Sequence, residues 1–334
     1  MKKLFFTWPG IGDNLLLFAA AHNIYKSTGE KVFIASKMND FLPYCQDFME
    51  YINWFSFEDL YLPSSAKEKK LKQVESAGFV PVFISSSGYK YLAPTYENNV
   101  TTWYHKHMIT RYCERMGYSG EVELSIPIEV PDVLTSTPKS YICVMCGGLQ
   151  NYKSIPKALM QSIVNEIGKT FQVVQIGSSK DPLLEGVLDF RGGSLISAYR
   201  ILRGAKFFIG NVGGLMHLAK AANCRSLILG TKGEPNSMSR YSTNVYVYPI
   251  DYCDRCSLNL RDPQHQKCFF AYKCVRHITA NQVLSAVSAN IDFLISRDNC
   301  LEYYEIAEAD PVNGLEDFIH STKTLSCESA LYKG

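Results

Sequence analysis

The chain has 334 residues, of which 46% are hydrophobic and 20% are charged, and its formal net charge is +2. This length is about twice that of a typical domain, so we expect a globular protein with two domains. The near-neutral charge does not indicate a nucleic-acid partner, although it does not exclude one. No apolar run approaches the ~20 residues that span a bilayer, so we expect no membrane span.

Residues 2–25 resemble a secretory signal in having two lysines, an apolar run and three consecutive alanines. A signal needs an uninterrupted apolar core, however, and Pro9, Gly10, Gly12 and Asp13 divide this one. A strand over 4–8, a helix over 13–29 and a strand over 31–36 account for the segment better, as a β-α-β unit. We therefore expect a cytoplasmic protein.

Further elements follow in chain order. A charged helix is predicted over 65–78, a strand over 80–86 and a helix over 100–117. Residues 122–140 contain three prolines and no helical period, which is typical of a linker. The alternation of strands and helices then resumes. The predicted strands are 141–148, 171–179, 206–211 and 225–230, and the predicted helices are 156–168, 194–205, 214–224 and 279–296.

Strands that alternate with helices predict parallel sheets, and two such runs predict an α/β protein with two Rossmann-like domains facing across a cleft. We place the first domain at 1–138 and the second at 139–296, the second containing a cysteine-rich loop at 251–276. A tail at 297–334 could pack back on the first domain. Ligands of such sheets bind beyond the carboxyl ends of the strands, so the cleft is the expected site.

The first strand-to-helix turn contains Gly10-Ile11-Gly12-Asp13. A dinucleotide fingerprint would need a third glycine where this chain has Leu15, and a suitable acid after the second strand is missing. Asp13 could simply be an acid stabilised by the helix dipole. Alternatively, it is a general base held on a rigid turn that faces the cleft.

Two later loops have the composition of anion sites. In the first, a strand runs into Gly213-Gly214 and a helix follows, with His217 one turn along; helix N-termini favour negative charge. In the second, Gly147-Gly148 is followed by Lys153, a mobile positive charge suited to a phosphate. A small-residue turn with a packed histidine and a solvated loop lysine are the alternatives.

Four cysteines have the spacing of a metal site: Cys253, Cys256, Cys268 and Cys274. A C-x-x-C pair with two further thiols nearby is typical of a structural Zn or Fe site, and the spacing does not separate the two metals. Disulfides or free thiols are the alternatives. Cys143 and Cys146 also form C-x-x-C, but on a strand they point to opposite faces, so we expect them in the core.

The order of these pieces resembles glycosyltransferase family 9, the heptosyltransferases of lipopolysaccharide cores and their relatives that modify autotransporters. The resemblance is densest over 204–230, where "GAKFFIG" is followed by "GGLMHLAKAA". It implies a GT-B fold and an inverting, metal-independent transfer of a sugar from a nucleotide-diphosphate donor, usually ADP-heptose. In autotransporter heptosyltransferases the cysteines at this place hold an iron.

The resemblance also implies roles for individual residues. Asp13 would be the general base that deprotonates the acceptor hydroxyl. Lys153, with Gly147 and Gly148, would hold the donor diphosphate. The remaining implied donor contacts are the amides of Gly213, Gly214 and Leu215, the side chain of His217, and Ser178 and Ser179 at the ribose.

One departure from the family lies at Val212-Gly213, where relatives have an acid followed by serine or threonine. A sugar other than heptose is therefore open, and so is loss of activity. The alternatives to a transferase are a sugar-nucleotide epimerase of the same fold and a non-catalytic nucleotide-sugar-binding protein. The acceptor, a glycan, a lipid-linked sugar or a protein, and any homo-oligomer are not identified by the sequence.

Overall fold

The structure is a computed structural model that describes residues 1–84, 107–131, 140–148, 153–230, 240–249, 277–296 and 303–304. The described residues form two compact units. The N-terminal unit ends at Pro127 and also contains Arg240–Ser242 and 303–304. The C-terminal unit begins at Ile128 and contains the other described residues. The predicted division at 138, the loop at 251–276 and most of the tail lie outside the described residues.

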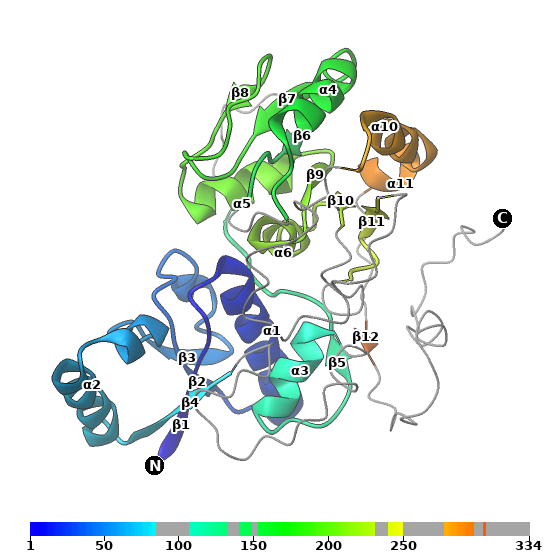
Figure 1. The fold of residues 1–334 in the computed structure, drawn as a ribbon. Helices are drawn as coiled ribbons and strands as arrows, with labels where there is room; N and C mark the ends of the chain where they lie inside the picture. The colour runs from blue at the N-terminus through cyan, green and yellow to red at the C-terminus, as the bar shows by residue number, and fades with distance from the viewer. Residues whose placement is uncertain are drawn as a thin grey trace. The chain divides into compact units, whose positions relative to one another are not determined.

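The N-terminal unit is built on a parallel sheet with the strand order β3-β2-β1-β4 (Figure 1). Its strands are β1 (Lys2–Phe6), β2 (Val32–Ala35), β3 (Met49–Ile52) and β4 (Phe79–Phe83). Leu4 in the central strand pairs with Phe33 on one side and with Pro81 on the other. The predicted β-α-β start of the chain is confirmed.

Helices cover both faces of this sheet. One face packs its aromatic and aliphatic side chains under α2 (Ser64–Ser76) and the short 3-10 helix η2 (Phe57–Tyr61). On the other side α1 (Ile11–Thr28) packs against α3 (Met108–Arg115). Residues 15–21 of α1 are completely buried, which explains why its sequence is apolar all round. A second 3-10 helix, η1, covers Leu42–Tyr44.

The segment predicted as a linker, 122–140, packs against the rest of the protein over its described residues. It begins with β5 (Val122–Glu123), which pairs antiparallel with β12 (Tyr303–Tyr304). Beyond β5, every second residue is buried: Leu124, Ile126, Ile128 and Val130. Within the C-terminal unit, the hydroxyl of Tyr199 donates to the carbonyl of Ile128 at 2.7 Å. The prolines stop regular structure here, but the alternating apolar side chains still bury themselves.

The C-terminal unit has a six-stranded parallel sheet with the order β11-β10-β9-β6-β7-β8. Counted along the chain from β6, this is the order 3-2-1-4-5-6 of a dinucleotide-type Rossmann sheet. The strands are β6 (Tyr141–Val144), β7 (Gln172–Gln175), β8 (Leu188–Asp189), β9 (Phe208–Asn211), β10 (Ser226–Leu229) and β11 (Asn244–Val247).

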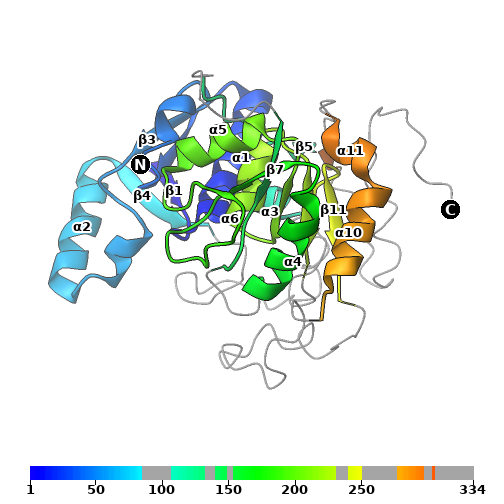
Figure 2. The same cartoon turned by 90° about the horizontal axis from the view of Figure 1, so that it is seen from above.

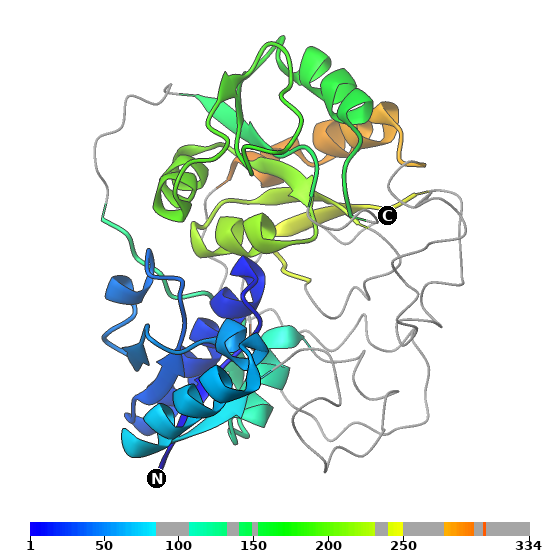
Figure 3. The same ribbon diagram turned by 60° about the vertical axis from the view of Figure 1, so that its left-hand side comes forward.

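Helices lie on the two faces of this sheet, as Figures 2 and 3 show. On one face α4 (Lys157–Ile167) lies beside α10 (Ala280–Ala289) and covers Ile142 and Val144. On the other face are α5 (Leu195–Gly204) and α6 (Gly214–Ala221). Cys143 points to that second face, where its thiol contacts the carbonyl of Ile201. Cys143 and Cys146 are both buried in the core, as predicted, and both are free thiols.

The predicted helix over 279–296 is wrong as a single element. The structure has two helices, α10 and α11 (Ile291–Ile295), separated at Asn290. Asn290 leaves the helical region, with φ −123° and ψ 19°, while its side-chain amide donates to the carbonyl of Ala286 at 2.8 Å. Asparagine side chains compete with the backbone for hydrogen bonds in this way, and this weakens a helix at that point.

Candidate functional site

The C-terminal sheet has its topological switch point between β6 and β9. The connection after β6 passes over one face through α4, and the connection after β9 passes over the other through α6. Because these two connections leave toward opposite faces of the sheet, a crevice is expected at the carboxyl ends of the neighbouring strands, where Rossmann sheets bind ligands. The segments that follow β6 and β9 contain Gly147-Gly148 and Gly213-Gly214, the two turns predicted to bind an anion.

The turn after β6 requires its glycines. Gly147 and Gly148 have φ values of +99° and +146°, a region that other residues rarely enter. Gly147 exchanges two backbone hydrogen bonds of 3.2 Å with Ile155, which closes the loop on itself. A β-carbon on Gly148 would lie 2.7 Å from Nδ2 of Asn211. The turn therefore leaves no room for a side chain at Gly148 beside Asn211, the last residue of β9.

Asn211, the last residue of β9, ties the two strand ends together. Its buried side-chain amide donates to the carbonyl of Gly147 at 3.1 Å and to that of Lys153 at 2.6 Å. The Lys153 backbone is thereby fixed at the switch point. The sequence prediction missed Asn211, although one signal was available: it is the polar final residue of an otherwise apolar strand that runs into a glycine turn.

The N-terminus of α6 lies at the other strand end, directly after β9. Gly213 is extended and caps the helix, and its carbonyl accepts hydrogen bonds from Met216 and His217. By helix geometry, the first amides of α6, including those of Gly214 and Leu215, have no acceptor within the helix. They supply partial positive charge next to the turn after β6.

His217 is buried in the first turns of α6, and its pKa is lowered to about 3. Burial is the main cause, and the positive charge of Lys153 is the second. The imidazole is therefore neutral at neutral pH. It can offer a hydrogen bond to an anion but no charge, so Lys153 and the α6 amides are the positive groups here.

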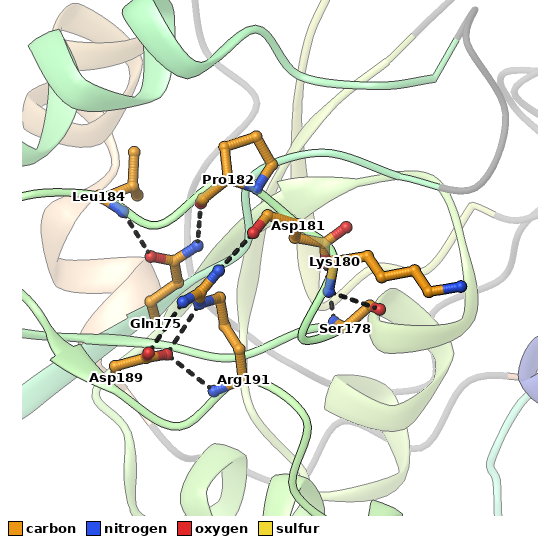
Figure 4. A network of polar contacts seen from close by, with 8 residues as sticks. All are labelled: Gln175, Ser178, Lys180, Asp181, Pro182, Leu184, Asp189 and Arg191. Carbon is orange, nitrogen blue, oxygen red and sulfur yellow. Dashed lines mark hydrogen bonds and ion pairs between the residues drawn. The ribbon is translucent and has the colours of Figure 1, made fainter.

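Ser178 and Ser179 follow β7, the strand next to β6, and both are exposed. Figure 4 shows how the loop that carries them is fastened. The Asp181 carboxylate accepts a hydrogen bond from the Ser178 amide at 2.8 Å. It also lies against the two neighbouring turns, since β-carbons on Gly147 and Gly177 would be 2.8 and 2.5 Å from its oxygens.

Arg191 fixes the same loop from the end of β8. Its guanidinium makes two hydrogen bonds, of 2.8 and 2.9 Å, to the Asp189 carboxylate and a third to the carbonyl of Asp181 (Figure 4). The Arg191 hydrogen bonds hold the pKa of Asp189 at about 2. Gln175 completes the network by bonding the backbone of Pro182 and Leu184. None of these contacts was predicted from the sequence.

In the N-terminal unit, Asp13 lies in the first turn of α1, after the carboxyl end of β1. The buried hydroxyl of Tyr112, on α3, donates to its Oδ1 at 3.0 Å. The adjacent Asn14 fixes the turn, because its amide donates to the carbonyls of Trp8 and Gly10 and its Oδ1 accepts from Ser36. The Asp13 carboxylate thus lies on a rigid turn at the carboxyl end of β1, next to the topological switch point of its sheet between β1 and β4.

The structure gathers most of the predicted site residues of the C-terminal unit at three adjacent strand ends. The groups after β6 and β9 are Gly147, Gly148, Lys153, Gly213, Gly214, Leu215 and His217, and those after β7 are Ser178 and Ser179. Asp13 belongs to the other unit. Cys253, Cys256, Cys268 and Cys274 lie outside the described residues, among which no group of three or more metal-ligating side chains occurs.

A comparison with protein-family models gave no match, and a comparison with curated proteins gave none either. Solved structures do match. Glycosyltransferase family 9 from Veillonella parvula DSM 2008 matches over 86% of this chain and 96% of its own, with a TM-score of 0.64 and 12% identity. The dodecameric, iron-containing glycosyltransferase TibC from enterotoxigenic E. coli H10407 matches over 87% and 76%, with a TM-score of 0.63 and 18% identity.

A third match is the E. coli ADP-heptose LPS heptosyltransferase II, with a TM-score of 0.60 and 15% identity over 86% of this chain and 98% of its own. The chain has the GT-B fold, built from two Rossmann-like domains, that these structures share. The resemblance to family 9 that the sequence indicated is confirmed at the level of the fold. Within the described residues, no helix is both long and apolar enough to cross a bilayer.

Proposed function

We propose that the protein is an inverting glycosyltransferase that moves a sugar from a nucleotide-diphosphate donor to a hydroxyl of an acceptor. The observation that carries the proposal is the switch point of the C-terminal sheet, where two glycine turns, a helix N-terminus and Lys153 converge. Positive groups on rigid backbone suit a diphosphate. The solved structures with the same fold are described as glycosyltransferases.

In this proposal the donor diphosphate lies between the Gly147-Gly148 turn and the amides of α6. Lys153 supplies the full positive charge, and neutral His217 supplies a hydrogen bond. Ser178 and Ser179 contact the ribose from the adjacent strand end, on a loop that Asp181 and Arg191 hold. Preorganised donors of this kind stabilise the charge that develops on the leaving diphosphate, and each good one contributes roughly 3 kcal/mol.

Asp13 is the proposed general base. The acceptor oxygen attacks the anomeric carbon and forms the new glycosidic bond, while the bond from that carbon to the diphosphate oxygen breaks. The electron pair leaves with the nucleoside diphosphate, and the acceptor proton passes to the Asp13 carboxylate. A positioned base contributes roughly 10²- to 10⁴-fold to such a step. Displacement from the opposite face inverts the anomeric configuration.

The donor sugar is proposed as heptose or a sugar of similar size. ADP-heptose is a reasonable first donor to try, because a TibC structure is described as a complex with an ADP-heptose. Val212 and Gly213 replace the acid and hydroxyl of the family pattern, so a donor with a different hydroxyl pattern is the second choice. TibC is also described as dodecameric, so a homo-oligomer of this chain is to be tested by its mass in solution.

A structural metal is the second part of the proposal, with Cys253, Cys256, Cys268 and Cys274 as its ligands. Their spacing supports it, and TibC is described as iron-containing. Cys45 and Cys146, which the structure describes, are less suited to bind a metal, because the ligand is the thiolate. Burial raises the thiol pKa of Cys45 to about 12 and that of Cys146 to about 11. Four thiolates leave no open coordination position, so the metal would stabilise a loop. Elemental analysis of the purified chain and of Cys253→Ser tests it.

Release of nucleoside diphosphate from candidate nucleotide sugars, with and without an acceptor, tests the reaction itself. A transferase releases diphosphate together with a glycosylated acceptor. An epimerase changes the sugar without needing an acceptor, and a binding protein is stabilised by the nucleotide sugar but converts nothing. Asp13→Asn should lower kcat by roughly 10²- to 10⁴-fold; unchanged activity in this variant would refute the base assignment.

A further inference from the structure

Tyr112 buries its hydroxyl in the packing between α1 and α3, although a phenylalanine would fill the same space. Tyr112 is 0% exposed, and its oxygen lies 3.0 Å from Asp13 Oδ1 and 3.0 Å from Thr7 Oγ1. A buried phenol needs hydrogen-bond partners, since an unsatisfied one costs free energy. Thr7 follows β1 directly and Asp13 belongs to α1, and Tyr112 on α3 is separated from them by 105 and 99 residues.

The direction of these two hydrogen bonds follows from the groups themselves. An ionised carboxylate only accepts, so the single phenol hydrogen points to Asp13, and the Thr7 hydroxyl must donate to the phenol oxygen. The phenol keeps its hydrogen, because burial and then the Asp13 charge raise the pKa of Tyr112 well above its ordinary value. The hydrogen bonds therefore have a single direction: Thr7 donates to Tyr112, and Tyr112 donates to Asp13.

Because of these hydrogen bonds, the two carboxylate oxygens of Asp13 have different surroundings. Oδ1 accepts the hydrogen bond of the phenol, and behind the phenol Thr7 is only 4% exposed, so this side of the carboxylate faces buried side chains. Oδ2 lies toward Gly10, where a β-carbon would be 2.7 Å from it. Gly10 has φ −63°, which any residue can adopt, so its lack of a side chain matters only for this close approach.

We propose that Tyr112, supported by Thr7, is a positioning residue that holds Oδ1 of Asp13 and so presents Oδ2 to the acceptor hydroxyl. The proposal rests on the proposed function, which makes Asp13 the base. Among charged groups, Arg115 of α3 also acts on the phenol. The group that faces the phenol from the residue after β1 is the uncharged Thr7.

The kinetic test compares Tyr112→Phe, Thr7→Val and Thr7→Ser in the full chain, with diphosphate release as the assay. Tyr112→Phe should lower kcat roughly 10- to 100-fold with little change in KM, because a misplaced catalytic group costs about 10²-fold. Thr7→Ser keeps the hydroxyl and should retain kcat, whereas Thr7→Val keeps the shape and should lose several-fold. If Thr7→Val is active and Thr7→Ser is impaired, Thr7 contributes only through packing and not through its hydrogen bond. The proposal is then wrong.

Two further measurements separate this proposal from the function on which it rests. An inactive Asp13→Asn with a fully active Tyr112→Phe overturns the positioning role and leaves the base assignment intact. If no donor reacts at all, a double-mutant cycle on urea unfolding still tests the contact, with Tyr112→Phe, Asp13→Ala and the double variant. Non-additive shifts in the midpoint support the coupling, and additive shifts contradict it.

Discussion

The side-chain amide of Asn211 donates a hydrogen bond of 2.6 Å to the backbone carbonyl of Lys153, across 58 residues of sequence. The same amide donates to Gly147, so one buried side chain joins the ends of β9 and β6. These contacts fix the position of the Lys153 backbone, whose ammonium is proposed to bind the donor diphosphate. They make Asn211 a structural determinant of the proposed donor site.

Asn211→Ala removes a donor from two carbonyl oxygens; that of Gly147 keeps the hydrogen bond from the Ile155 amide, whereas the part-buried carbonyl of Lys153 loses its donor at 2.6 Å. We expect the free energy of unfolding to fall by about 1–3 kcal/mol, the cost of buried unsatisfied groups. Binding of the donor nucleotide should weaken as well. Urea unfolding measures the first effect and calorimetric titration the second. The control is Asn165→Ala, which removes an exposed amide that bonds Gln161 and should change stability by less than about 0.5 kcal/mol.

Gly148→Ala adds a methyl group at φ +146° and directs it at the Asn211 amide, 2.7 Å away. Both the backbone strain and the displaced Asn211 oppose the substitution. Gly186→Ala is the matched control, because Gly186 also has positive φ, +73°, but no atom lies within 4 Å of its added carbon. The control should lose about 1–2 kcal/mol from backbone strain alone. A Gly148→Ala protein no less stable than the control would refute the close approach.

Stability should depend on pH through His217. Its pKa is about 3 in the folded chain and near 6.5 when unfolded, so the unfolded state binds the proton first as the pH falls. The free energy of unfolding should therefore decrease between pH 6.5 and 3, by at most about 1.4 kcal/mol per pH unit from this group. His217→Gln removes that contribution. Between pH 4 and 7, the free energy of unfolding should depend less steeply on pH in the variant than in the unmodified protein. An equal pH dependence in the two proteins would contradict the neutral, buried state of His217.

Gly10→Ala should impair activity without greatly impairing folding. The added carbon would lie 2.7 Å from Asp13 Oδ2, and the flexible carboxylate can move away from it. We expect kcat to fall by roughly 10- to 100-fold, as for a displaced catalytic group, with a nearly unchanged melting temperature. Gly12→Ala is not a suitable control, because Gly12 lies in the same turn; Ala77→Gly, outside the site, serves instead. Full activity in Gly10→Ala would show that the position of Oδ2 is not critical.

The sequence predicted much of the fold because its local patterns agree with the tertiary structure. Alternation of apolar strands and amphipathic helices gave the β-α-β start and the elements of the C-terminal unit, and the glycine turns marked two of the strand ends. Asn290 breaks the last predicted helix, because one side chain bonds its own backbone. A hydrophobic period does not register such a competition.

The residues of the candidate site could be proposed from the sequence only where their signals are local. Glycines with positive φ, a helix start and a loop lysine are visible in short stretches of sequence. Asn211, Tyr112 and Arg191 were missed, because each acts through a contact that depends on the folded arrangement of separate elements. The neutral state of His217 was missed for the same reason, since it results from burial and from a lysine 64 residues away.

The most direct test of the central claim is calorimetric titration with nucleoside diphosphates, beginning with ADP and continuing with GDP, UDP and CDP. The account predicts that at least one binds the intact chain. Lys153→Ala should weaken that binding roughly 10- to 100-fold, as expected for a lost charged hydrogen bond. Lys169→Ala, which removes an exposed lysine paired with Glu166, should leave the affinity unchanged. Equal affinity in the two variants, or no binding by the intact chain, would contradict the account.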